Sequence, residues 1–221
     1  MATLTDIRRS GPGFRRRTLV IDGDPWREVP AGVAVALELE VSDDVDRDEL
    51  AAAIRTAEVP RAREKALRLL TAKDRSRYGL RTRLIDEGYG AEVAEQTVED
   101  LERIGLVNDE RFAHALARTL ANVRGMGRSG IARELRSAGI DEEFAAEALD
   151  EALGGDDELE AARLLAVRAA ARGGATVDRI TAKLVRRGYR LPLALTAARQ
   201  AIAARGGTAA DPSEPDGHFD D

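Results

Sequence analysis

The stretch Leu80-Arg-Thr-Arg-Leu-Ile-Asp-Glu-Gly-Tyr89 decides the fold, because its pattern returns at Ile131–Ile140 and again at Ile180–Tyr189. The last residue but one of each copy is a glycine, and these three glycines are 51 and 49 residues apart. Apolar residues stand eight and four positions before each glycine and directly after it. Apolar positions four apart predict a helix, and the glycine predicts a left-handed C-cap that ends it. One structural unit is therefore present three times.

Each unit is predicted to hold three helices, nine in all. A second group of apolar residues follows each glycine and predicts a further helix. An amphipathic segment precedes each copy, at Arg61–Ala72, Asp109–Asn122 and Asp157–Arg172. We expect four residues to cap helices: Ser76, Asn108, Asp141 and Thr176. The expected fold class is all-α, with three tandem three-helix repeats forming an elongated curved array.

A small module is expected before the repeats. The run Arg17–Ile21, a turn at Asp22–Pro25 and a return strand at Trp26–Val29 predict a β-hairpin, followed by helices at Ala31–Leu39 and Asp46–Glu58. The predicted organisation is a disordered N-terminus at 1–13, the hairpin and short-helix module at 14–58, repeats at 61–105, 106–154 and 155–205, and a disordered acidic tail at 206–221.

Composition excludes several classes of protein. The 221 residues contain no cysteine, so disulfides, thiolate zinc sites and thiol catalysis are excluded. The most apolar stretch, Ala31–Leu37, is too short to span a membrane, and residues 1–13 lack the apolar core of a secretory signal. We therefore expect a cytoplasmic protein without a membrane partner. His114 and His218 have no partners at ligand spacing, so we expect no enzyme, no metal and no cofactor.

Charge divides unevenly along the chain. The net charge of −6 consists of −4 over residues 1–60, +3 over 61–205 and −5 over 206–221. The second helix of every unit is rich in basic residues, whereas the third helices of units one and two are acidic. This asymmetry predicts one basic side suited to phosphates or to an acidic protein surface. The alternative is a set of solvated helix faces that pair with neighbouring acids, and charge alone leaves both open. The candidate contact residues are Arg75, Arg77, Arg81, Arg83, Arg124, Arg128, Arg133, Arg136, Arg179, Lys183, Arg186, Arg187 and Arg190.

The repeats resemble those of a known family. The run Leu106-Val-Asn-Asp-Glu-Arg-Phe-Ala113, followed by Gly127, Ile131 and Ala138-Gly-Ile140, is similar to the central repeat of the RecX regulatory proteins. The segment from Ala66 to Tyr89 resembles their first repeat, and Lys183–Tyr189 resembles their third. The resemblance covers about residues 16–205. Family first repeats usually carry Glu where this chain has Gly79, so Ser76 loses its capping-box partner.

The resemblance implies a non-enzymatic modulator, in most members an inhibitor, of the RecA recombinase. It implies binding to the RecA filament and suppression of strand exchange, ATP hydrolysis and coprotease activity, within DNA repair, recombination and the SOS response. We expect a monomer whose binding to single- and double-stranded DNA is weak and independent of sequence.

Two alternatives stay open. Three-helix units also resemble helix-turn-helix modules, which predicts a sequence-specific duplex-binding regulator. The second alternative is a scaffold that binds only proteins.

Overall fold

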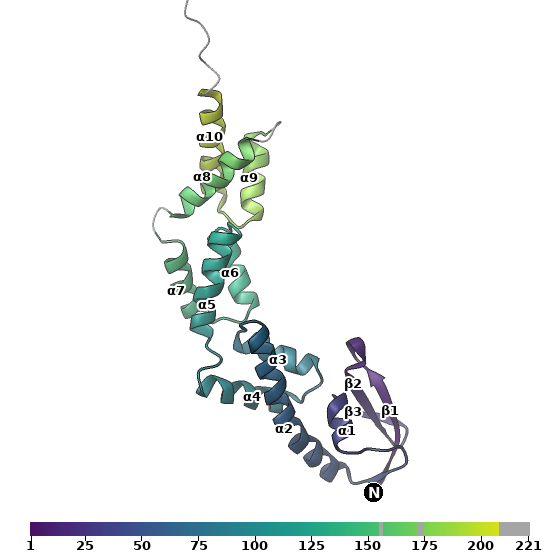
Figure 1. Ribbon diagram of the computed structural model, residues 1–221. Helices are drawn as coiled ribbons and strands as arrows, with labels where there is room; N and C mark the ends of the chain where they lie inside the picture. Colours follow the sequence, from purple (N-terminus) through teal and green to yellow (C-terminus); the bar gives the residue numbers. More distant parts are fainter. Residues whose placement is uncertain (155–156, 172–174, 208–221) are drawn as a thin grey trace, which may run out of the picture. The chain divides into compact units, whose positions relative to one another are not determined.

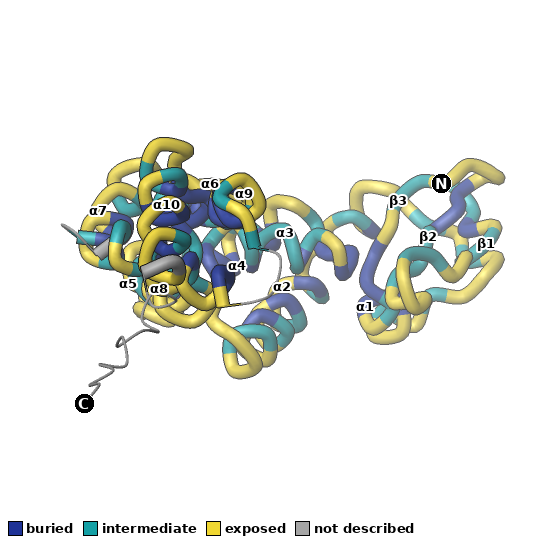
Figure 2. The backbone as a smooth tube through the Cα atoms, turned by 90° about the horizontal axis from the view of Figure 1, so that it is seen from above, coloured by how far each residue is buried: buried dark blue, intermediate teal, exposed yellow. Residues whose placement is uncertain are grey.

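The computed structural model describes residues 1–154, 157–171 and 175–207. Within this range the chain forms two compact units (Figure 1). The first holds Met1–Phe112 with Ala138–Ile140, and the second holds Ala113–Ser137 with the described residues of 141–207. Buried stretches, dark blue in Figure 2, occur near β2 and α1 and again near α6 and α9. The predicted curved array concerns the arrangement of the repeats in space and stays a prediction.

A four-stranded antiparallel sheet begins the chain. Its strands are β1 (Ala2–Ser10), β2 (Arg16–Ile21), β3 (Asp24–Pro30) and β4 (Asp44–Val45), in the order β3-β2-β1-β4. The predicted hairpin forms β2 and β3, with Asp22 and Gly23 at positive φ in the turn.

The prediction that residues 1–13 are disordered is wrong. Most of this segment is the strand β1, which pairs with both β2 and β4. The β-branched residues Thr3, Thr5 and Ile7 favour extended backbone, and the strand is stabilised by hydrogen bonds to residues that follow in the sequence.

Helix α1 (Ala31–Ala36) is shorter than predicted, whereas α2 (Arg47–Ala72) is longer. Separate helices were predicted on either side of residues 59–60, but α2 runs through Pro60 without interruption. Proline removes one backbone hydrogen bond and crowds the preceding turn. In that turn the Arg61 guanidinium donates to the Ala57 carbonyl at 3.1 Å. The first half of α2 packs on the sheet through Leu50 and Ile54, which are buried with strand residues.

The first three-helix repeat consists of the second half of α2, α3 (Arg77–Asp86) and α4 (Ala91–Arg103). Its core contains Leu80, Leu84, Val93 and Leu101. Tyr89, directly after the glycine, also belongs to this core.

The other two repeats supply six helices within the described residues. The second holds α5 (Asp109–Arg118), α6 (Arg128–Ser137) and α7 (Glu142–Ala152), and the third holds α8 (Asp157–Ala170), α9 (Val177–Arg186) and α10 (Leu191–Gly207). A π-helical turn over Thr119–Val123 extends α5. The predicted acidic tail starts inside α10, since residues 206 and 207 are helical, and residues 208–221 lie outside the described range.

The predicted ends of the second helices are confirmed. Gly88, Gly139 and Gly188 have φ of 99°, 74° and 90°, the left-handed region that glycine enters at no steric cost. Three of the predicted caps accept a backbone N–H: Ser76 from Gly79, Asn108 from Arg111 and Thr176 from Arg179. Asp141 stands at the N-cap of α7, but its side chain makes no capping hydrogen bond.

Candidate interaction surface

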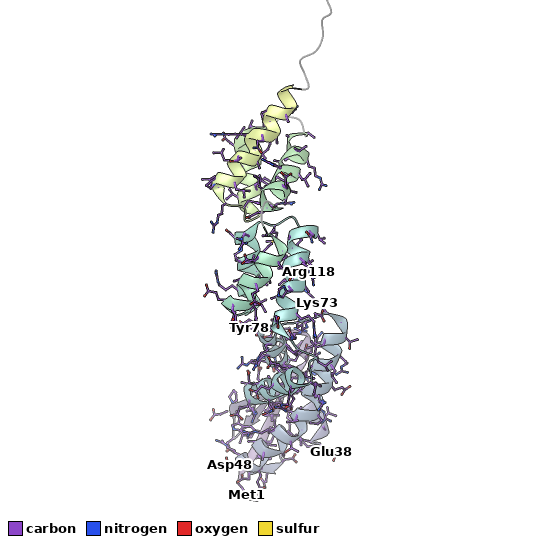
Figure 3. All side chains as sticks on the ribbon, turned by 90° about the vertical axis from the view of Figure 1, so that its left-hand side faces the viewer. Met1, Glu38, Asp48, Lys73, Tyr78 and Arg118 are labelled. Carbon is purple, nitrogen blue, oxygen red and sulfur yellow. The ribbon has the colours of Figure 1, made fainter. Side chains whose placement is uncertain are left out.

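The N-terminal end of each of two second helices, α3 and α6, contacts a glycine turn. That turn is the one that ends the second helix of the following repeat. In the first unit, which includes residues 138–140, Ser76 Oγ donates to the Ala138 carbonyl at 2.6 Å. A side chain on Gly139 would collide with Tyr78, which is labelled in Figure 3. In the second unit, the Gly127 N–H donates to the Arg187 carbonyl at 3.0 Å. Ser76 and Gly127 are 51 residues apart, so the contact recurs at the same place in the repeat.

At each of these two contacts, which we call joints, a carboxylate from the first helix of the following repeat accepts a backbone hydrogen bond. The Arg77 N–H donates to Asp109 Oδ1 at 2.7 Å, and the Arg128 N–H donates to Glu158 Oε1 at 2.8 Å. Arg77 and Arg128 are the first residues of α3 and α6, where free N–H groups favour negative charge. The starts of α3 and α6 are therefore occupied by the protein itself and are not ligand sites.

The turn at Gly88 makes the corresponding contact with the N-terminal module. A Cβ on Gly88 would lie 2.8 Å from Arg16 Cγ. The neighbouring Glu87 forms ion pairs with Arg83 at 2.7 Å, Arg15 at 2.9 Å and Lys65 at 3.1 Å. Burial opposes ionisation of Glu87, but the hydrogen bonds and charges of Lys65, Arg83 and Arg15 hold its pKa below the ordinary value. The module thus takes the place that an earlier repeat would fill.

The basic residues of the first repeat are largely neutralised. Arg77 pairs with Glu95 at 2.7 Å and with Glu102 at 2.5 Å, and Arg81 pairs with Glu95 at 2.6 Å. The hydrogen bond from Arg77 is the main cause that lowers the pKa of Glu95 below its ordinary value. Arg83 is one of the partners of Glu87, and Arg75 is half-buried. For this repeat, the alternative in which basic residues pair with neighbouring acids describes the structure.

The second repeat differs. Arg128, the counterpart of Arg77, pairs with Asp150 of α7 at 2.7 Å. Arg133 and Arg136 lie on the exposed face of α6, and Arg124 is exposed in the turn before it. No ion pair of these three residues occurs within residues 1–154, 157–171 and 175–207. Their guanidinium groups are therefore accessible to an external anion.

The third repeat also carries accessible cations. Arg179, Arg186 and Arg190 are exposed, and Lys183 is half-buried. Arg187 has a structural role, because its guanidinium donates to the Arg124 carbonyl at 3.1 Å. Among the described residues, Lys183, Arg186 and Arg190 have no ion pair. Twelve of the thirteen predicted residues thus separate into a paired group on α3 and a largely accessible group on and around α6 and α9, and the half-buried Arg75 belongs to neither.

Two acidic partners were not foreseen from the sequence. Glu87 is buried, and no charge pattern sets it apart from the exposed Asp86 beside it. The Glu151 carboxylate contacts Nδ1 of the half-buried His114 and pairs with Arg118 at 3.6 Å. The His114 side chain lies on α5 and is 21% exposed. No helix in the described part of the chain is long and apolar enough to cross a membrane.

The fold and this surface define a class of protein built from consecutive three-helix domains, with cations on the second helices. Residues 62–101 match the first three-helix domain of RecX, and residues 108–149 match the second. The chain belongs to the RecX family of regulatory proteins. The regulatory protein RecX of Thermobifida fusca is 35% identical over 161 residues, 71% of this chain and 87% of that protein. The regulatory protein RecX of Streptomyces coelicolor is 35% identical over 153 residues, 67% of this chain and 81% of that protein.

Solved structures of similar fold are also RecX proteins. A crystal structure of regulatory protein RecX matches with a TM-score of 0.58 at 20% identity, covering 92% of this chain and all of the other. The crystal structure of RecX from Lactobacillus salivarius matches with a TM-score of 0.59 at 21% identity, covering 67% of this chain and 99% of the other. At this identity the likeness concerns the fold.

Proposed function

We propose that this chain binds the RecA–DNA filament in the cytoplasm and inhibits the recombinase, ATPase and coprotease activities of RecA, without catalysis of its own. The curated relatives are regulatory proteins, and the three-helix domains that define the family are present here in order. In this proposal the chain acts in DNA repair, recombination and the SOS response. Its DNA contacts are weak and independent of sequence.

The cations of α6 and α9 form the proposed contact surface. The observation that carries this choice is the difference in pairing between repeats. Arg133 and Arg136 are exposed without an ion pair among the described residues, whereas Arg77, Arg81 and Arg83 are held by acids of their own unit. An accessible guanidinium can bind a phosphate or a carboxylate directly, while a paired one must first lose its internal partner.

Contact through two repeats also suits a polymer. Once one helix is bound, the other helix of the same chain is held close to the next binding point on the filament. Its second contact is then intramolecular, and modest individual contacts give a higher total affinity.

The test is RecA-dependent ATP hydrolysis and strand exchange on single-stranded DNA, measured over a titration of this protein. We expect inhibition by the unaltered chain and a loss of potency of about tenfold or more for the double variant Arg133→Glu with Arg136→Glu. The matched control is Arg68→Glu with Arg103→Glu. It makes the same change in net charge at arginines whose side chains are 66% and 69% exposed.

The control variant should stay within about twofold of the unaltered chain. Equal loss in both variants would mean that net charge and not α6 determines potency. Absence of any effect on RecA at full coverage of the filament would reject the function. Tight binding to one duplex sequence without RecA would favour the sequence-specific regulator instead.

A further inference from the structure

The turn between β1 and β2 carries a concentration of arginine outside the residues that match the RecX three-helix domains. Residues 8–17 read Arg-Arg-Ser-Gly-Pro-Gly-Phe-Arg-Arg-Arg, with five arginines and no acid. We call these ten residues the hairpin tip. The tip lies before residue 62, where the match to the first RecX domain begins.

The backbone of the hairpin tip holds an aromatic side chain out of the protein. Gly11, Gly13 and Phe14 have φ of 71°, 64° and 55°, and Phe14 is 65% exposed. Positive φ is uncommon for a bulky residue and costs free energy. Arg17 fixes this conformation in part, because its guanidinium donates to the Phe14 carbonyl at 2.8 Å. The tip therefore presents a large exposed apolar ring on a backbone that Arg17 holds by a hydrogen bond.

Two arginines in the hairpin tip lack a compensating acid. Arg9 and Arg17 are opposite each other in the pairing of β1 with β2. Like charges at directly opposite positions destabilise a pair of strands. No ion pair of either residue occurs within the described ranges, whereas Arg8 pairs with Asp6, Arg15 with Glu87 and Arg16 with Glu28. A bound polyanion would relieve the repulsion between Arg9 and Arg17.

We propose that the hairpin tip binds single-stranded DNA, with phosphates on Arg9 and Arg17 and a base stacked on Phe14. Guanidinium groups bind phosphate through paired hydrogen bonds, and an exposed aromatic ring stacks on any base regardless of sequence. A duplex keeps its base faces stacked inside the helix, so the ring selects the single strand. This inference does not rest on the proposed action on RecA, because the chain binds the strand by itself.

The test is fluorescence anisotropy of a labelled 20-nucleotide oligothymidine with the full chain, over a series of salt concentrations and without RecA. Replacement of both arginines, Arg9→Gln with Arg17→Gln, should weaken binding about tenfold or more. It should also reduce the slope of log affinity against log salt by about 1.4, or about 0.7 for each phosphate that is no longer neutralised. Phe14→Ala should weaken binding by about 5- to 100-fold and leave the slope unchanged.

Two controls separate the hairpin tip from general charge and from misfolding. Arg68→Gln with Arg103→Gln removes the same charge from exposed arginines elsewhere and should bind within about twofold of the unaltered chain. Arg9→Lys with Arg17→Lys keeps the charge but loses the paired hydrogen bonds, so it should retain the salt slope and bind more tightly than the glutamine variant but less tightly than the unaltered chain. All variants should show the helix content of the unaltered chain, since the replaced side chains lie outside the buried core.

Three results would overturn the proposal. One is a Phe14→Ala variant that binds as tightly as the unaltered chain, which would leave only phosphate contact. Another is equal affinity for a duplex of the same length, and the last is equal loss in the Arg68 and Arg103 control. The assay contains no RecA, so its result is independent of whether the chain regulates that protein.

Discussion

Helices α3 and α6 occupy the same place in two copies of one repeat, yet their basic residues are used differently. Both begin with an arginine whose N–H binds a carboxylate of the following repeat and whose side chain pairs with the acidic third helix. Beyond that first residue, Arg81 and Arg83 of α3 are paired, while Arg133 and Arg136 of α6 are exposed. Repeated charge in a sequence therefore does not imply a repeated surface.

The glycines of the two helices give the largest expected contrast. Gly79 and Gly130 are 51 residues apart and occupy equivalent positions. A Cβ on Gly130 would lie 2.6 Å from the Arg187 carbonyl oxygen, which is backbone of the α9 turn and cannot move freely. Gly130→Ala should destabilise the second unit by about 2–3 kcal/mol, as overpacking at a close contact does. Chemical denaturation and hydrogen exchange of the α6 amides measure this loss.

Gly79→Ala is the matched control. A Cβ there meets only Ser76 Oγ at 3.1 Å, and alanine favours the helix by about 1 kcal/mol over glycine. Its stability should therefore stay within about 1 kcal/mol of the unaltered chain. If both alanine variants lose stability equally, the space around Gly130 of α6 is no more closely packed than the space around Gly79 of α3.

A smaller contrast is expected between the arginines of the two helices. Arg77→Ala removes two ion pairs and packing from a half-buried side chain, and should cost the first unit about 1 kcal/mol. Arg133→Ala removes an exposed side chain and should change stability by less than about 0.5 kcal/mol. Thermal unfolding of both variants measures the difference. A loss for Arg133→Ala as large as that for Arg77→Ala would show that Arg133 has an internal role.

Much of the fold follows from local features of the sequence. The three glycines predicted the left-handed ends of the second helices because glycine takes up this common helix-ending conformation at no steric cost. Ser76 and Thr176 were recognisable as caps because capping is a local hydrogen bond. Features determined within a few residues were therefore accessible without the structure.

Features that depend on distant residues were not accessible in the same way. Strand β1 exists through its pairing with β2 and β4, and α2 continues through Pro60 although proline alone predicts a break. The candidate surface shows the same limit. The basic character of α3 was evident, but its pairing depends on where Glu87 and Glu95 lie in space. Part of the hairpin tip falls in the segment predicted to be disordered, although five arginines within ten residues mark it.

The smallest expected effect concerns the pH dependence of the α3 ion pairs. The folded-state pKa of Glu95 lies below its ordinary value of 4.5, chiefly because Arg77 donates a hydrogen bond to it. A lowered pKa means that the ionised group stabilises the fold above pH 4.5, and that this contribution disappears as the pH falls through the folded-state pKa. Glu95→Gln should thus reduce stability at pH 7 by at most about 1 kcal/mol, because the pair is partly exposed. The difference from the unaltered chain should vanish at the acid end of a series of denaturation curves.

In a background that already carries Arg77→Ala and Arg81→Ala, Glu95→Gln should have almost no effect at any pH, since the partners that lower the pKa are gone. A difference of the same size in both backgrounds would mean that Arg77 and Arg81 do not lower the pKa of Glu95, and would remove the pairing that distinguishes α3 from α6.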